Sequence, residues 1–367
     1  MRKIFIIFGF FLPDVINAQV NYESGISGVY EVILAVDDLP YSVTYWNQYG
    51  FKIIDSVKIK ADASQNLYGV NSSLTIYRLQ NGDIDSHGLL RLWKWEKPLG
   101  PGVGYSEPET IGSRMAVMKT NDIMRLYDIY DFLRGNKKPW LPTEPITDDL
   151  FGLNKGDKDF IKRPVLVREN AVYGQYFNHV FFQRYGYEIP GYGTIHPDTP
   201  LKTSEFTHHD WIIPGKDMIS LKYITEVLGF KAENEPEING DWQKGPKRVF
   251  IMRDGYTHLY QGFVSPNNIC GKLKFFIPLA PKPDMSEFQK LGQLGITMHS
   301  LYAPDITKIR SKALNHPGLS VSKLQKNEFG ENSFLLQDSS GVSWQIIEKK
   351  ETKHKPQNKV NFIFTNN

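Results

Sequence analysis

Two acidic and two basic residues recur at matching places in the sequence. Glu31 and Asp210 each lie seven residues before another aspartate, within a short apolar run. Arg91 and Lys274 each end a run that starts with glycine, Gly-Leu-Leu-Arg and Gly-Lys-Leu-Lys. An acid and a base on neighbouring strands form an ion pair or anchor the polar groups of a ligand. We therefore predict that Glu31 contacts Arg91 and that Asp210 contacts Lys274, and all four are candidate ligand-binding residues.

Histidines near the second acid offer a different chemistry. His208 and Asp210 lie two positions apart, so their side chains share one face of a strand, whereas His299 is expected on the other face of its strand unless a bulge shifts the register. Histidine nitrogens with a carboxylate would suit Zn, Fe or Mn. A neighbouring lysine or arginine repels such a cation. The sequence thus favours ion pairs over a metal, and the best candidate metal ligands are His208, Asp210, His258 and His299.

An aromatic side chain extends the first candidate site. Trp93 lies two residues after Arg91 and should share its face of the strand. A tryptophan beside an arginine suits a flat organic ligand with an anionic group, through stacking and charge-assisted hydrogen bonds. The alternative is that Trp93 packs in the core between sheet and helix, as most single aromatic residues do.

A sequence repeat supplies the elements that must position these residues. Residues 36–52 and 215–231 share the same pattern. An aspartate shortly after an apolar run is followed by a helix-length segment and then by Gly-Phe-Lys at the same distance. In the first copy, Asp38 marks the start of a helix and Gly50 its end. Three strand-like runs follow, which gives the order βαβββ. The same order recurs from about residues 114, 207 and 297, and Asn121 and Gly135 are expected to delimit the second helix.

Four βαβββ units in two pairs, with this spacing from aspartate to Gly-Phe, resemble the vicinal oxygen chelate superfamily. Its members include glyoxalases, bleomycin-resistance proteins and extradiol dioxygenases. The resemblance covers roughly residues 28–350. It implies an α+β fold of two glyoxalase-like domains, in which paired units form curled mixed sheets around a funnel that usually holds a divalent metal.

The resemblance also implies which positions would bind that metal. The family commonly has a histidine on the first strand, seven residues before the aspartate, and Glu31 and Asp210 stand there in this sequence. Met115 and Met298 stand there in the other two units, and methionine is a poor ligand for these ions. Gln345 takes the place of the family's last-strand carboxylate and is a further ligand-binding candidate.

Composition and the chain ends suggest the compartment and the partners. Met1 to Gln19 has a basic start, an apolar run over residues 4–12 and a small residue at Ala18, which is typical of a cleaved export signal. We expect an exported protein, periplasmic or secreted. Cys270 is the only cysteine, so no disulfide forms within the chain. A net charge of +3 does not favour nucleic acid, and beyond the signal no apolar stretch is long enough to span a membrane.

The Pro- and Gly-rich stretch before residue 205 suggests a boundary between two domains. The predicted organisation is a signal peptide (1–18), a first domain of two units (28–186, with a long insertion at about 135–165), a linker (187–204), a second domain (205–350) and a polar tail (351–367).

Three functions are compatible with these features. The leading hypothesis is a tandem-repeat protein that binds a small organic molecule in a sheet-lined cavity without a metal. The second is a metal-dependent lyase, isomerase or extradiol-type dioxygenase. The third is a non-catalytic scaffold whose funnels are filled by side chains. Whether the protein is an enzyme stays open at this point.

Overall fold

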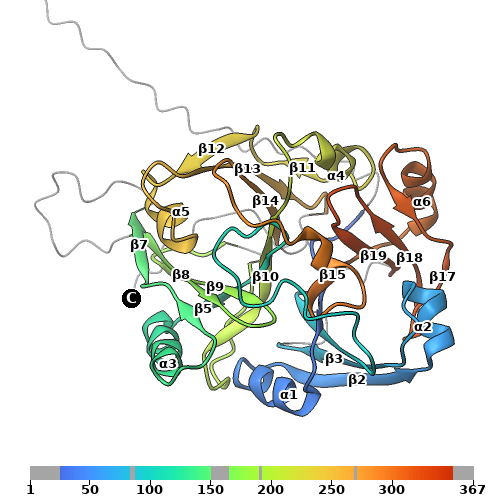
Figure 1. Ribbon diagram of the computed structural model, residues 1–367, viewed down its shortest axis with the longest axis horizontal. Helices are drawn as coiled ribbons and strands as arrows, with labels where there is room; N and C mark the ends of the chain where they lie inside the picture. Colours follow the sequence, from blue (N-terminus) through green and yellow to red (C-terminus); the bar gives the residue numbers. More distant parts are fainter. Residues whose placement is uncertain (1–24, 83–86, 150–164, 190–191, 268–270, 350–367) are drawn as a thin grey trace, which may run out of the picture.

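The computed structural model describes residues 25–82, 87–149, 165–189, 192–267 and 271–349. The predicted signal peptide, the polar tail, Cys270 and part of the predicted insertion lie outside the described residues. Two curled sheets lie side by side, with helices around their outer edges (Figure 1). No helix in the described ranges is long and apolar enough to cross a membrane.

The first sheet is built from the first and the last units of the chain. Its strands follow the order β16-β18-β19-β15-β1-β4-β3-β2, and β17 pairs with β18. The strands are β1 (Glu31–Ala35), β2 (Lys52–Ile59), β3 (Leu74–Gln80), β4 (Leu89–Trp95), β15 (Gly295–Ala303), β16 (Ser320–Val321), β17 (Gln325–Lys326), β18 (Asn332–Gln337) and β19 (Ser343–Glu348).

The second sheet is built from the two middle units. Its order is β11-β13-β14-β10-β5-β9-β8-β6, with β12 on β13 and β7 on β8. The strands are β5 (Arg114–Thr120), β6 (Leu141–Pro142), β7 (Ile146–Asp149), β8 (Leu166–Tyr173), β9 (Asn178–Tyr185), β10 (Thr203–Ile212), β11 (Lys231–Ala232), β12 (Glu237–Gly240), β13 (Thr257–Val264) and β14 (Lys272–Pro278).

This pairing corrects the expectation that consecutive units share a sheet. The first strand of unit one, β1, pairs antiparallel with β15 of unit four, and β10 of unit three pairs with β5 of unit two. Each of these first strands is almost wholly buried, so each lies in the middle of a sheet. All four meet that requirement equally, which is why the sequence did not indicate which two would pair. The predicted residue limits of the two domains stay a prediction.

Helices begin and end largely where the capping residues predict. Asp38 accepts a hydrogen bond from the backbone N–H of Tyr41 at the start of α1, and Gly50 follows its end with a φ of +87°. The second unit differs by one residue, because Asp122 rather than Asn121 caps α3. The helices are α1 (Leu39–Gln48), α2 (Ala61–Tyr68), α3 (Ile123–Gly135), α4 (Lys222–Glu226), α5 (Lys244–Val249) and α6 (Ile306–Leu314), with short 3-10 turns η1 (Ile219–Leu221) and η2 (Ser286–Gln289).

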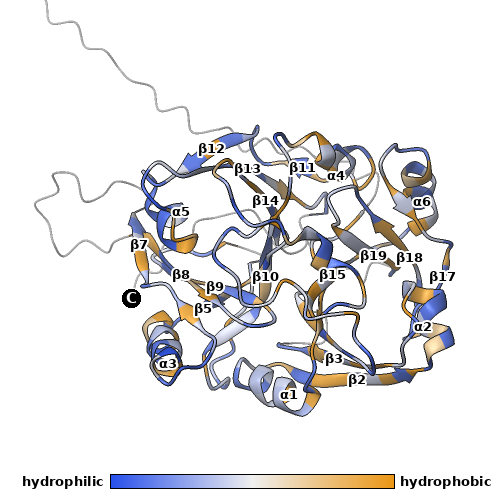
Figure 2. Ribbon diagram, in the orientation of Figure 1, coloured by the Kyte–Doolittle hydropathy of each residue, from blue (hydrophilic) through white to orange (hydrophobic). Residues whose placement is uncertain are grey.

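The two largest clusters of buried apolar residues combine side chains of both sheets, whereas smaller clusters each lie on one sheet. Trp211 of the second sheet stacks on Phe275, and its ring centroid lies 5.2 Å from that of Trp344 in the first sheet. Apolar residues are spread along the strands of both sheets, whereas the edge strand β12 is hydrophilic (Figure 2). Because side chains alternate along β10, the face that carries Asp210 points away from the first sheet. We call it the Asp210 face.

Candidate functional site

Arg91 occupies the middle of the first sheet and is fully buried. Its Nη2 donates to the Glu31 carboxylate, and its Nε lies 3.3 Å from Glu31 Oε1. Its Nη1 donates to Gln345 Oε1 at 2.7 Å and to Glu328 Oε1 at 2.9 Å. The structure thus confirms the predicted contact between Glu31 and Arg91 and adds Gln345 to the same cluster.

A second arginine, which the sequence did not indicate, completes this cluster. Arg78 of β3 donates to Glu31 Oε1 at 2.6 Å and also pairs with Glu331. Ser300 of β15 donates to Glu31 Oε2 at 2.7 Å. Burial alone would raise the pKa of Glu31, but the two guanidinium groups outweigh it and lower the pKa to about 2. Arg78 lies opposite Arg91 in the β3–β4 ladder, so alternation along "LTIYRL" was the signal that could have found it.

These residues do not fit a divalent metal. Both Glu31 oxygens already accept hydrogen bonds from guanidinium or hydroxyl groups. A metal ion there would lie against two permanent positive charges, which repel it strongly in a buried setting. Trp93 is also fully buried, with its ring centroid 4.6 Å from that of Tyr68. Roles for Glu31, Arg91, Trp93 and Gln345 in ligand binding stay predictions, and their visible contacts are with one another and with the core.

The equivalent position in the second sheet is built differently. Asp210 and Lys274 lie beside each other in the parallel register of β10 and β14, as predicted. However, no ion pair joins them in the part of the chain that the structure describes, and the buried Asp210 Oδ1 has no hydrogen-bond partner. Lys274 is half-buried, and its ammonium group lies 5.8 Å from the centroid of the Phe182 ring. The predicted contact is therefore corrected to a longer-range attraction, because the lysine leans over an aromatic ring.

Further ionisable groups share the Asp210 face. Glu169 of β8 and Arg184 of β9 are half-buried there, and His208 lies two residues before Asp210. Buried atoms of two of them lack a hydrogen-bond partner: Nε2 of His208, and Nε and Nη1 of Arg184. Helix α5 closes over this region, since a Cβ on Gly245 would lie only 3.3 Å from Glu169 Oε2.

Two carboxylates on this face have pKa values near neutrality. Burial raises the pKa of Glu169 to about 7; Lys274 opposes this, and the charges of Asp148 and Asp210 add to it. Burial raises the pKa of Asp210 to about 6, again opposed by Lys274. Carboxylates that titrate near neutral pH can exchange protons with a bound molecule. The pKa of His208 is held well below its usual value by burial and by Lys274, so this imidazole is neutral.

The four candidate metal ligands do not converge. His208 and Asp210 share a face of β10. His258 instead contacts Glu109, whose Oε1 lies 2.7 Å from His258 Nδ1. His299 lies between the sheets, with its ring centroid 4.7 Å from that of Trp211. Across the described ranges, no group of three or more His, Cys, Asp or Glu side chains is arranged to hold a metal ion.

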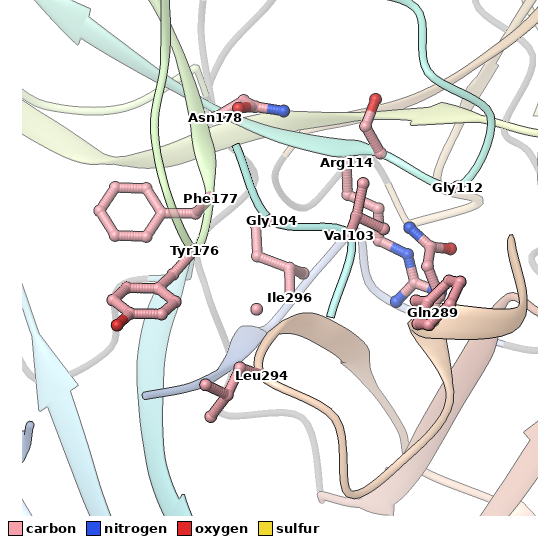
Figure 3. A pocket seen from close by; sticks show the side chains of 13 residues that line it. Val103, Gly104, Gly112, Arg114, Tyr176, Phe177, Asn178, Gln289, Leu294 and Ile296 are labelled. Atoms are coloured by element: carbon pink, nitrogen blue, oxygen red, sulfur yellow. The ribbon is translucent and has the colours of Figure 1, made fainter. Parts of the chain in front are cut away.

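Two hollows lie outside the Asp210 face. One, of about 30 Å³, lies where the ends of β5, β9 and β15 meet, with the buried Arg114 on one side and Tyr176 on the other (Figure 3). Its size is that of about one water molecule. The other, of about 290 Å³, lies between α1 and the turn from β8 to β9. Tyr176 and Phe177, in the turn between β8 and β9, line both hollows.

Comparison with known proteins adds information at the level of the fold. No family model and no curated protein matches the chain. Solved structures do match. A putative dioxygenase from Bacillus subtilis has a TM-score of 0.50 and 9% identity, over 88% of this chain and 85% of that one. A glyoxalase I mutant from Zea mays has a TM-score of 0.51 and 12% identity, over 89% of this chain and 94% of that one.

The chain has the vicinal oxygen chelate fold. The curled sheets and the order of their strands confirm the predicted α+β class of glyoxalase-like architecture. Identities of 9% and 12% extend the likeness to the fold alone, so the activities of these two proteins remain theirs. Within this fold, an ion-pair cluster fills the middle of the first sheet. Buried polar atoms without a hydrogen-bond partner lie on the Asp210 face of the second sheet.

Proposed function

We propose that this vicinal oxygen chelate protein binds a small organic molecule on the Asp210 face, without a metal. The observation that carries the proposal is the set of buried, unpartnered polar atoms there: Asp210 Oδ1, His208 Nε2, and Arg184 Nε and Nη1. Buried polar atoms in native proteins are nearly always hydrogen-bonded to protein, water or ligand. The matching cluster in the first sheet satisfies its charges internally, so the two sheets differ in what they leave available.

The groups present define the class of molecule. Lys274 and Arg184 supply positive charge for a carboxylate or similar anion, and Asp210 supplies an acceptor for a hydroxyl or amine. The Arg184 guanidinium lies close to aromatic rings, 5.0 Å from the centroid of Tyr192 and 6.0 Å from that of Tyr187. A small aromatic or unsaturated acid combines a flat surface for these rings with an anionic group. We infer that such an acid is the preferred ligand class.

Binding can be tested with benzoate as the probe and benzyl alcohol as its neutral counterpart. We expect benzoate to shift amide signals of β9, β10 and β14 in nuclear magnetic resonance spectra, and benzyl alcohol to shift them much less. Lys274→Met should weaken benzoate binding, whereas Lys216→Met, which removes an exposed lysine, should not. Prior treatment with a chelator should change nothing. Binding that disappears with the chelator would contradict the metal-free proposal and favour the metal-dependent enzyme instead.

A second candidate function is proton transfer within the same site. It is supported by the pKa of Glu169, about 7, because a general base works best when its pKa lies near the working pH. Incubation of small carbonyl acids with the protein in heavy water tests it, since a base of this kind exchanges carbon-bound protons for deuterium. Glu169→Gln should abolish the exchange and keep benzoate binding. Exchange that persists in Glu169→Gln would rule out this role for Glu169.

We also propose that the protein is exported, on the sequence of its first 18 residues alone. Secreted or periplasmic material should start near Gln19 when its N-terminus is sequenced. A mature protein that still begins at Met1 would contradict export through a cleaved signal.

A further inference from the structure

The larger hollow, between α1 and the turn from β8 to β9, lies apart from both clusters of ionisable residues. It has a volume of about 290 Å³, close to the lower end of the range for small-molecule pockets. Among the described residues that line it, most are aromatic and the charged ones are acidic. The aromatic lining residues are Tyr41, Tyr45, Trp46, Trp140, Tyr176 and Phe177.

We propose that this hollow binds a small organic cation, such as a quaternary or primary ammonium compound. Aromatic faces attract cations through the negative potential above the ring, and the effect grows when water is excluded. Two carboxylates at the rim add a second attraction. This site is independent of the one on the Asp210 face, which carries the cationic groups Lys274 and Arg184 and would repel the same ligand.

The aromatic wall is held in place by specific packing. The rings of Tyr45 and Trp140 lie nearly parallel, at 4°, with centroids 5.8 Å apart. Trp140 lies against Gly174, where an added Cβ would be only 2.2 Å from the indole ring. The Tyr45 hydroxyl lies 2.8 Å from His179 Nε2. The aromatic surface is therefore preorganised, which reduces the entropy lost when a ligand binds.

The charge balance around the hollow is negative. Asp37 and Asp38 are both exposed at its rim. Asp37 Oδ2 accepts a hydrogen bond from Tyr176 at 2.6 Å, and Asp38 Oδ1 accepts one from the backbone of Tyr41 at 2.9 Å, so each bond uses one oxygen of its carboxylate. No lysine or arginine is among the described residues that line the hollow. Burial lowers the pKa of His179, beneath Tyr45, to about 3, so this histidine adds no positive charge near neutral pH.

One lining residue also has an unused donor. The indole N–H of Trp46 is buried and has no hydrogen-bond partner. A hydroxyl group on the ligand would satisfy it, so an amino alcohol fits better than a simple amine. A sugar would also stack on aromatic rings and accept this hydrogen bond, but it would gain little from two carboxylates. The negative charge therefore favours the cation over the neutral sugar.

The test uses the full chain and choline as the probe, followed by calorimetry and tryptophan fluorescence. The comparison compound is the neutral carbon analogue of choline, in which a tert-butyl group replaces the trimethylammonium group. We expect choline to bind at least about tenfold more tightly than this analogue. Equal binding of the two, binding of glucose but not choline, or no binding of choline and of butylammonium would each overturn the proposal.

Matched variants connect binding to the hollow. Trp140→Leu should weaken choline binding at least about fivefold, and Asp37→Asn should weaken it and reduce its sensitivity to salt. Asp37→Asn keeps an acceptor for Tyr176 and leaves the cap at Asp38 intact, so it remains informative if Trp140→Leu fails to fold. The controls are Trp242→Leu and Asp62→Asn, which alter an exposed tryptophan and an exposed aspartate away from the hollow. Controls that weaken binding as much as the test variants would contradict the assigned site.

Discussion

Arg91 Nη1 lies 2.7 Å from the side-chain oxygen of Gln345, which joins a strand of the first unit to a strand of the last. The same guanidinium group donates to Glu31 and Glu328. In the middle of the first sheet, a fixed cation of the protein thus holds together one acceptor from the first unit and two from the last.

Replacement of Arg91 by methionine should strongly destabilise the protein. Glu31 and Glu328 would lose a buried cationic partner, and the side chains of all three residues are fully buried. Loss of one partner of such a group costs roughly 3 to 5 kcal/mol. The free energy of unfolding in urea measures it. Arg134→Met is the matched control, because its pair with Asp131 is exposed and should be worth about 0 to 1 kcal/mol.

The double variant Glu31→Leu with Arg91→Met should recover only part of that loss. If the two residues formed an isolated pair, their joint removal would restore most of the stability. Here Arg78 and Ser300 would each lose their contact with Glu31, and Glu328 would lose its contact with Arg91. Arg78 would keep its pair with Glu331, and Glu328 would keep its hydrogen bond from Tyr68. Complete recovery would show that the wider cluster has no energetic role, and stoichiometric metal in the wild type that depends on Glu31 would contradict the ion-pair interpretation altogether.

Acid should destabilise the protein through buried histidines such as His299. Burial holds the pKa of His299 well below 6.5, with further lowering by His209 and Arg114, and both ring nitrogens lack a hydrogen-bond partner. Below about pH 6.5, His299 takes up a proton in the unfolded chain but not in the folded chain. Lowering the pH to about 5 should therefore reduce the free energy of unfolding by roughly 2 kcal/mol. His299→Phe should remove that share of the loss, measured as the difference between unfolding at about pH 7.5 and pH 5. An unchanged difference would mean that the folded protein protonates His299.

Lys274→Met should raise the pKa of Asp210 above its value of about 6. Burial raises this pKa and Lys274 opposes it, so only the raising effect would remain. The pKa of Glu169 should rise for the same reason. Carboxyl carbon shifts in nuclear magnetic resonance titrations measure both. A fall in either pKa would show that Lys274 does not act on these groups, and Lys216→Met should leave both unchanged.

A single cut in the predicted linker should leave the two chain halves associated. Both sheets combine strands from the two sides of the cut: β1 pairs with β15, and β5 pairs with β10. With a protease site engineered into residues 194–198, the fragments should co-elute in size-exclusion chromatography and separate only in concentrated urea. Separation of the fragments without denaturant would support the predicted division into two independent domains, joined by residues 187–204.

Local sequence patterns predict most of the helices and strands, whereas the pairing of units far apart in the chain could not be predicted. The aspartate caps at Asp38 and Asp305 and the alternating strands follow from neighbours in sequence, so these elements could be predicted. Helix α5 was missed because "KGPKRV" is short and contains glycine and proline, which mask any helical period. The choice of partner unit was missed because all four first strands suit the buried middle of a sheet, so none of them indicates which two will pair.

The candidate site shows the same contrast. Glu31 and Arg91 could be paired from the spacing within one unit, whereas Glu328 and Gln345 reach the same guanidinium from the last unit. The gap between Asp210 and Lys274 depends on where a long, flexible side chain settles, here over the Phe182 ring. The aromatic hollow combines residues of α1, the segment before β6 and the turn before β9, which no local pattern brings together.

The pairing of the first and last units has a consequence for the order in which the chain can fold. The hydrogen bond from Ser300 to Glu31 spans 269 residues, so the first sheet cannot close until the end of the chain has been synthesised. The second sheet comes from the contiguous middle of the chain and is free to form earlier. Arg78 and Arg91 lie only 47 and 60 residues from Glu31, so they can neutralise its charge before the last unit has been synthesised. The buried carboxylate of Glu31 can thus be paired with Arg78 and Arg91 before Ser300 and the rest of the last unit are in place.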